Sequence, residues 1–168
     1  MKLTKRMFAL VAIVSCFLIG SNAFAQGGNT ASDTGTTTAS VISSLSVTNN
    51  TDLQFGEAIQ QDAAKTIPAA SGATFTVNGE PSRFYNITVP ADGTKYMVTD
   101  SGLGSLYNEQ IQLSTFHFIT SELNSTTQGQ LSTSGIDTIK IGATRAAIFG
   151  NQVKGAYVGT YPVTIIYQ

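Results

Sequence analysis

The sequence is poor in the residues that form covalent cross-links and metal sites. Its 168 residues include one cysteine, one histidine and no tryptophan. A single cysteine excludes a disulfide within the chain, and a single histidine without partner cysteines argues against a structural zinc site. Charged residues are also few, at 11% against 42% hydrophobic residues, which excludes a charge-rich disordered tail and a protein with several membrane spans. We therefore expect one packed domain with no metal and no cofactor.

The first 25 residues have the pattern of a secretory signal peptide. Three basic residues open the segment, an apolar run covers residues 7–19, and Ala-Phe-Ala ends at Ala25. We expect cleavage after Ala25, with no membrane span in the mature chain. The alternative is a lipoprotein anchored through Cys16, because Ile-Val-Ser-Cys resembles a lipobox, although the apolar run continues beyond the cysteine.

The predicted mature chain is acidic. Three of the nine basic residues leave with the signal peptide while all ten acidic residues remain, which gives a net charge of about −4. The six remaining basic residues are scattered between Lys65 and Lys154. Because nucleic acids attract clusters of Lys and Arg, we expect no nucleic-acid partner.

A polar segment separates the signal peptide from the domain. Residues 26–38 are rich in Gly, Asn, Ser and Thr, with Ala31 as the only apolar residue, and predict a flexible leader. We expect the folded domain to span residues 39–168.

Alternating apolar residues predict short strands throughout that domain. The first strand is expected to start at Ala39 and to end before Asn49-Asn50-Thr51-Asp52, with one face formed by Ala39, Val41, Leu45 and Val47. Later inward rows are Phe75 and Val77; Tyr85, Ile87 and Val89; Ile139 and Ile141; and Tyr157, Tyr161, Val163, Ile165 and Tyr167.

Three local features qualify this pattern. Residues 57–64 are the only stretch that predicts a helical turn. Residues 78–81 predict a loop longer than a two-residue hairpin, because Pro81 lacks the N–H that a returning strand needs. Ile111 and Leu113 have the opposite phase to Phe116 and Phe118, so we expect a β-bulge near Ser114 or Thr115. Seven to nine short strands then favour an all-β antiparallel sandwich over a parallel sheet with helices.

The residues that carry chemistry form no catalytic pattern. His117 lies on the face opposite its two phenylalanine neighbours, without a Gly-x-Ser-x-Gly motif, and is expected to be solvated. The acidic residues stand mostly beside turns, where Asp bonds to its own backbone, so we expect no enzyme. A hydrolase with a pair of these carboxylates remains an alternative.

Three segments resemble the DUF4402 family of exported bacterial domains. They are LSVTNNTDLQFG at residues 45–56, ATFTVNGEPSRFYNITVP at residues 73–90 and GAYVGTYPVTIIYQ at residues 155–168. The same outline is similar, more distantly, to spore coat protein U-like domains and to archaic chaperone–usher pilins. The pilin resemblance implies an immunoglobulin-like sandwich that lacks its last strand, with the gap filled by a chaperone and then by the leader of a neighbouring subunit.

These observations lead to one expectation for function and one alternative. We expect an exported, non-catalytic structural or adhesive protein of a Gram-negative surface, present in the periplasm, on the outer surface or in an extracellular fibre. Its partners would be other copies or related subunits and a periplasmic chaperone, and Val41, Leu45 and Val47 are the candidate strand-exchange residues. The alternative is a monomeric glycan-binding module that uses loops 92–95 and 101–107.

Overall fold

The structure is a computed structural model that describes residues 32–100 and 104–168. The predicted signal peptide, Cys16 and the first part of the predicted leader lie outside these residues. The chain divides into residues 1–39 and residues 40–168, and all strands of the described part belong to the second unit. Within the described part, no helix has the length and apolar character needed to cross a membrane.

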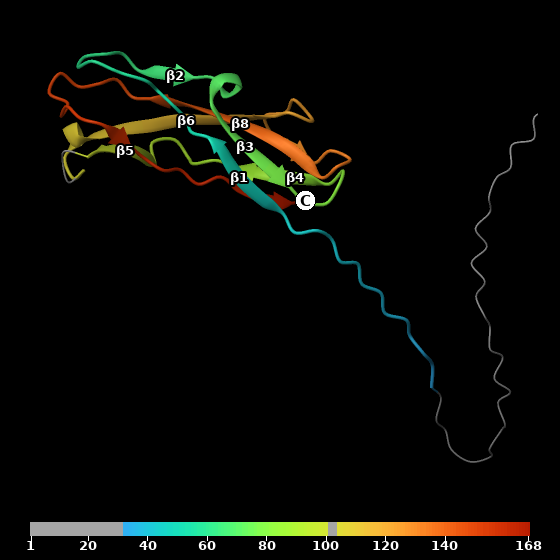
Figure 1. Ribbon diagram of the computed structural model, residues 1–168. Coiled ribbons are helices and arrows are strands. Elements are labelled where there is room, and N and C mark those ends of the chain that lie inside the picture. Colours follow the sequence, from blue (N-terminus) through green and yellow to red (C-terminus); the bar gives the residue numbers. More distant parts are fainter. Residues whose placement is uncertain (1–31, 101–103) are drawn as a thin grey trace, which may run out of the picture. The chain divides into compact units, whose positions relative to one another are not determined.

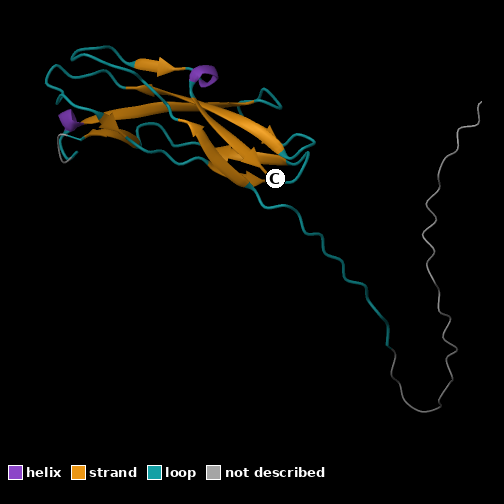
Figure 2. Cartoon of the chain, viewed as in Figure 1, coloured by secondary structure: helices purple, strands orange, loops and turns teal. Residues whose placement is uncertain are grey.

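Two antiparallel sheets form the domain and confirm the predicted all-β sandwich (Figure 1 and Figure 2). The larger sheet has the order β1-β3-β8-β6-β5-β9, with β2 also paired to β8, and the smaller sheet has the order β10-β4-β7. Three of the strands, β2, β7 and β9, have only two or three residues, which raises the count above the expected seven to nine. The bounds are β1 Ser46–Thr51, β2 Lys65–Ile67, β3 Ala73–Asn78, β4 Phe84–Thr88, β5 Lys95–Thr99, β6 Gln110–Thr120, β7 Gln128–Gln130, β8 Ile136–Arg145, β9 Tyr157–Val158 and β10 Thr164–Tyr167.

The main core lies between the two sheets, and its inward rows in β3, β4 and β8 are the predicted ones, whereas the side chains of β1 are exposed. Phe75 and Val77 of β3 and Tyr85 of β4 are buried, while Ile87 and Val89 pack against them. The full buried set of this main core is Ala73, Phe75, Val77, Tyr85, Phe118, Leu131, Ile139 and Ile141. Removing this apolar surface from water is the chief term that holds the sheets together.

The predicted bulge in β6 is confirmed. The register between β6 and β8 shifts between Ser114 and His117, and Thr115 has a φ of 51°. The Asp92 carboxylate accepts the Thr115 N–H at 2.5 Å, which satisfies a donor that the bulge removes from the ladder. As a result, Leu113 and Phe118 are both buried on the inner face despite their opposite phases.

The predicted long connection after β3 is also confirmed. Residues 79–83 join β3 in the larger sheet to β4 in the smaller sheet, so the two strands never pair with each other. The N–H of Gly79 donates to the carbonyl of Gly135 instead.

The first strand differs from the prediction at both ends. It begins at Ser46 rather than Ala39 and continues through Asn49, Asn50 and Thr51, which had predicted a turn. The polar residues remain in the strand because β1 is an edge strand whose side chains bond to β3: the Asn50 amide donates to the Thr76 hydroxyl at 2.7 Å. The pairing shifts between Asn49 and Thr51, so the predicted break is a bulge.

The last segment is divided between the sheets, although its alternation predicts one continuous face. Tyr157 lies in β9 of the larger sheet, whereas Ile165 and Tyr167 lie in β10 of the smaller sheet. Gly159 sits between them, where a Cβ atom would approach the Tyr96 carbonyl oxygen to 2.5 Å. The chain therefore passes so close to β5 that only glycine fits.

The predicted helical turn over residues 57–64 is wrong, because these residues form an irregular loop. The described helical turns are two short 3-10 segments, η1 at Ala69–Ser71 and η2 at Tyr107–Glu109. His117 is half-buried rather than solvated, and its Nε2 accepts the Ala69 N–H at 3.0 Å. The histidine thus anchors η1 to β6.

A buried carboxylate completes the core at one end of β8. Asp137 is 2% exposed and accepts hydrogen bonds from the Tyr85 hydroxyl at 2.7 Å and from the N–H groups of Glu122 and Thr138. Burial and then the contact with Asp137 raise the pKa of Tyr85, so the hydroxyl stays protonated and keeps donating.

We predict that Tyr85→Phe lowers the free energy of unfolding by about 1–3 kcal/mol, because a buried acceptor loses a donor that water cannot replace. Urea unfolding followed by circular dichroism measures this loss. The control is Tyr96→Phe, which removes a surface bond from Gln112 and should cost less than about 0.5 kcal/mol. Equal losses for the two variants would contradict the role of the Tyr85 contact.

Candidate functional site

A long groove runs along the inner face of the larger sheet. It has a volume of about 1420 Å³, and its walls are residues 52–60 and 152–161. Its floor includes Met97 of β5 and Leu113 of β6. These residues belong with a second buried cluster of Phe55, Leu113 and Ala143, against which no residue of β10, β4 or β7 packs in the described chain. The groove therefore lies over the part of the larger sheet that the three-stranded sheet leaves open.

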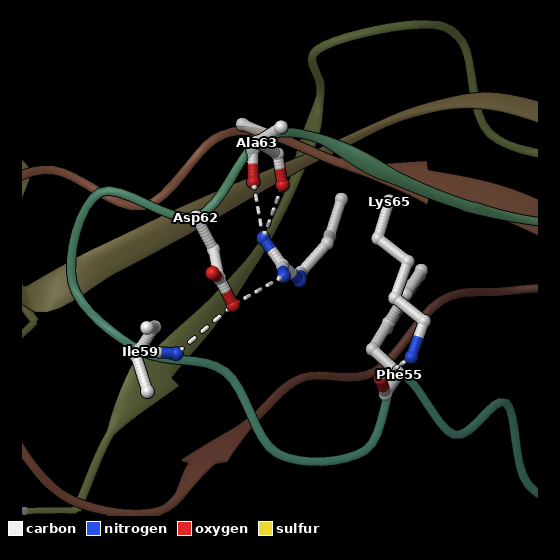
Figure 3. Close-up of polar contacts among 7 residues, drawn as sticks. Phe55, Ile59, Asp62, Ala63 and Lys65 are labelled. Atoms are coloured by element: carbon white, nitrogen blue, oxygen red, sulfur yellow. Dashed lines mark hydrogen bonds and ion pairs between the residues drawn. The ribbon is translucent and has the colours of Figure 1, made fainter.

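The first wall is fastened to the sheet by Arg145, the last residue of β8 (Figure 3). Arg145 is 3% exposed, and its Nη1 donates to the carbonyls of Ala63 at 3.1 Å and Ala146 at 3.0 Å. Its Nη2 lies 3.7 Å from the Asp62 carboxylate, which also accepts the Ile59 N–H at 3.0 Å. A buried charge needs such partners, and here they hold the loop in place.

A second contact holds the same wall closer to β1. Figure 3 shows the Lys65 ammonium group reaching the carbonyl oxygen of Phe55, a distance of 2.7 Å. The Phe55 ring is buried with Leu113 under this contact. Together with the arginine, this lysine replaces the hydrogen bonds that a regular strand would give the loop.

The second wall is held by a buried amide. Gln152 is 4% exposed, and its Nε2 donates to the Gln110 carbonyl and to the Tyr157 hydroxyl, each at 3.0 Å. The Gln60 amide reaches across from the first wall and donates to the Gln152 carbonyl at 2.7 Å. This bridge joins the walls where residue 60 meets residue 152.

Tyr161 bounds the groove where the second wall leads into the main core. Its ring lies 5.3 Å from Phe116 and 6.3 Å from Phe75, between ring centroids. Burial, with a smaller contribution from the charge of Asp52, raises the pKa of Tyr161 to about 12. The phenol therefore remains a neutral hydrogen-bond donor at the groove wall at physiological pH.

The candidate strand-exchange residues are not part of the groove. Val41 is 96% exposed and lies outside any strand. Leu45 packs against the domain's own main core, and Val47 lies in β1 opposite Val77. The structure thus separates the three residues: Leu45 packs into its own sandwich, and Val47 is held there by strand pairing although its side chain is 36% exposed.

The sandwich domain matches one known protein family. The model of a family described as a domain of unknown function, DUF4402, matches residues 66–167. The chain belongs to the DUF4402 family. No curated protein matches the sequence. The family match includes β3 to β10 and the second wall, whereas β1 and the whole first wall precede it.

The carboxylates of this DUF4402 domain are used mainly by its own backbone. Asp92 accepts from Thr115, Glu80 accepts the Ser43 N–H at 2.9 Å, and Glu109 accepts from the N–H groups of Ser105 and Leu106. No group of three or more metal-ligating side chains occurs within residues 32–100 and 104–168. Only the Glu109 contacts are the local turn bonds expected from the sequence, whereas Asp92 and Glu80 bond to backbone N–H groups 23 and 37 residues away.

The polar residues that shape the groove were not predicted as site residues. The inward orientation of Arg145 could have been predicted from the sequence, because it continues the inward phase of Ile139 and Ile141 along β8. Asp62, Gln60 and Gln152 lie in irregular segments, where alternation gives no orientation. Only the fold brings their partners close.

We predict that Asp62→Asn lowers the free energy of unfolding by about 1–3 kcal/mol, because the buried Arg145 loses its counter-charge. This range lies between the small value of an exposed ion pair and the larger cost of breaking a buried one. Hydrogen exchange should also speed up at the Ile59 and Gln61 amides. Asp33→Asn is the charge-matched control, since Asp33 is exposed and bonds only to the Thr34 N–H. An unchanged stability for Asp62→Asn would contradict the anchoring role.

We predict that one tyrosine ionises near pH 12 and that Tyr161→Phe removes this step from an ultraviolet titration. Because folding raises this pKa above its usual value of 10.0, the contribution of Tyr161 to stability is complete below pH 10 and is lost as the pH rises through about 12. The variant should therefore lose less stability than the wild type over this interval. Tyr107→Phe, at an exposed position, should leave the late step in place.

Proposed function

We propose that this DUF4402 chain is an exported, non-catalytic structural subunit of a Gram-negative surface fibre, and that its groove receives an extended segment of a second molecule. The observation that carries the proposal is the open groove between residues 52–60 and 152–161, with Met97 and Leu113 in its floor. A groove of this kind on a sheet favours strand addition, in which backbone hydrogen bonds give affinity and alternate side chains fill pockets.

The groove walls offer backbone for such pairing. Residues 52–59 and 159–163 belong to no strand in the described chain. The edge strand β9 has only two paired residues before this irregular segment begins. An added strand would extend the ladder from β9 and place its inward side chains beside Met97 of the neighbouring β5, which the smaller sheet does not reach.

The occupant that we propose is residues 26–42 of a second copy, which are the leader and the four residues that follow it. Ser43 marks where the domain starts to hold its own chain: its N–H donates to Glu80 at 2.9 Å and its carbonyl accepts the Tyr167 hydroxyl at 3.1 Å. The hydrogen bond from Ser43 lowers the pKa of Glu80 and so keeps this acceptor charged. Residues 32–42 are exposed, including Val41 and Ile42, at 96% and 39%.

Of the three candidate strand-exchange residues, this arrangement leaves Val41, with its neighbours, as the donor. Leu45 and Val47 stay in their own sandwich, so donation does not require β1 to leave β3. A donor with only two large apolar residues fills little of the groove, which favours a weak contact between copies and leaves room for a related subunit or a periplasmic chaperone as a stronger occupant.

Assembly of the mature chain tests the proposal. We predict that residues 26–168 form oligomers whose size rises with concentration in light scattering, and that deletion of residues 26–42 gives a folded monomer, because Leu45 and Val47 are retained. A peptide of residues 26–42 should bind the deleted form and slow hydrogen exchange at residues 155–161.

A cross-link provides the geometric control. The predicted mature chain has no cysteine, so a mixture of Val41→Cys and Met97→Cys can form only one mixed disulfide, and each variant alone measures its own homodimer background. Tyr96→Cys, on the opposite face of β5, should not cross-link. Oligomers that persist without residues 26–42, or a chain that neither assembles nor binds the peptide, would overturn donation by the leader.

A further inference from the structure

A second feature of the domain, separate from the groove, exposes aromatic side chains to solvent. Leu106 is 57% exposed, Tyr107 64% and Phe149 50%. They come from two separate segments, η2 with the residue before it and the loop that follows β8. The main core does not use these side chains, and they do not line the groove.

The two aromatic rings are held in a fixed arrangement. Tyr107 and Phe149 meet edge to face, with ring centroids 5.4 Å apart and planes at 82°. The Asn151 amide donates to the Tyr107 hydroxyl at 2.8 Å, and the Asn108 amide donates to the Asn151 carbonyl at 3.3 Å. A ligand would therefore meet a surface already ordered, with little loss of side-chain freedom on binding.

Unused hydrogen-bonding capacity surrounds the rings. The amide oxygens of Asn108 and Asn151 accept no hydrogen bond from the described residues, and the Tyr107 hydroxyl accepts one bond while its own proton remains available. Backbone bonds hold the two loops together beneath, including Val153 N–H to the Asn108 carbonyl at 2.9 Å. The surface thus presents two acceptors and one donor beside exposed aromatic faces.

The side chains of this surface carry no charge. Glu109 is the nearest acidic residue in the sequence, and its carboxylate is bonded to the N–H groups of Ser105 and Leu106. A charged ligand would find no counter-charge among Leu106, Tyr107, Asn108, Phe149 and Asn151. A purely apolar partner would leave the two amide oxygens without donors, which is unfavourable once water is excluded.

We propose that Tyr107, Phe149, Asn108 and Asn151 form a binding site for a neutral carbohydrate. A sugar ring has one face of C–H groups that can stack on the electron-rich face of an aromatic ring. Its hydroxyl groups donate to the amide oxygens and accept from the Tyr107 hydroxyl. A few polar groups beside an apolar platform give orientation as well as contact area.

The register of the larger sheet places this site at the end opposite the start of β1. Ser46 at the start of β1 pairs with Asn78, which pairs with Ile136 at the start of β8. The site adjoins the opposite end, where η2 leads into β6 and Arg145 ends β8. The site therefore lies far from the start of β1 but adjoins the second wall of the groove, where the Val153 N–H donates to the Asn108 carbonyl. Tyr107, Phe149, Asn108 and Asn151 do not line the groove, so the site does not depend on the fibre proposal.

An array of defined neutral oligosaccharides, with sialylated and sulfated counterparts, tests the proposal on the mature chain of residues 26–168. We predict binding to at least one neutral oligosaccharide and weaker binding to its charged counterparts. Titration calorimetry with that oligosaccharide should show at least a 10-fold loss of affinity for Tyr107→Ala and for Phe149→Ala.

Two controls separate this site from general surface effects. Tyr96→Ala and Phe84→Ala remove aromatic rings that are each 40% exposed elsewhere and should bind as the wild type does. Circular dichroism and urea unfolding show whether each variant is folded, and Asn151→Ala tests the polar contribution without removing a ring. Absence of binding to every neutral oligosaccharide, or equal binding by Tyr107→Ala and Phe149→Ala, would overturn the proposal. It would also be overturned if these variants changed only self-association, because the rings would then be a protein contact.

Discussion

The inward row of β8 is the feature on which the rest of this domain depends. Asp137, Ile139, Ile141, Ala143 and Arg145 are each at most 3% exposed, so a charged residue closes both ends of an apolar row. Each charge is paired with a different part of the chain, Asp137 with Tyr85 of the smaller sheet and Arg145 with the loop around Asp62, although the buried Arg145 Nε has no partner among the described residues. Burial of an unpaired charge is too costly to tolerate. The Asp137 end of β8 is therefore covered by the smaller sheet, and the Arg145 end by the irregular loop.

This difference between the two ends explains why the sandwich has an open part. A strand from the smaller sheet brings a side chain to Asp137 and continues the apolar packing beside it. At the Arg145 end, the guanidinium group binds the carbonyls of Ala63 and Ala146, which a regular strand pair would engage in its ladder. The loop then follows the arginine rather than the sheet, and the space between it and residues 152–161 is the groove. The buried Arg145 therefore accounts for both the irregular loop and the open groove beside it.

Alternation of apolar residues predicted the buried rows, but it could not predict contacts between segments far apart in the sequence. The rows around Phe75, Tyr85 and Ile139, the bulge at Thr115 and the all-β class are confirmed, because one buried face leaves a period of two in the sequence. The polar strand Asn49–Thr51 was read as a turn, since local propensity favours one, yet hydrogen bonds to β3 on an edge override it. The groove walls could not be predicted, because Arg145, Asp62, Gln60 and Gln152 acquire their roles through contacts between segments far apart in the chain.

The edges of the smaller sheet limit how such a domain can associate. Its edge strand β10 follows Pro162, which lacks an N–H, and Ile166 of that strand is 62% exposed. Proline beside an edge strand removes a donor that a neighbouring strand would need, so pairing along this edge is disfavoured. The Tyr167 hydroxyl further ties the end of β10 to Ser43 and Glu80, and so holds the start of the domain against this edge. In the proposed assembly, added backbone pairing would therefore use the groove beside β9, where the larger sheet ends in a two-residue strand and an irregular segment.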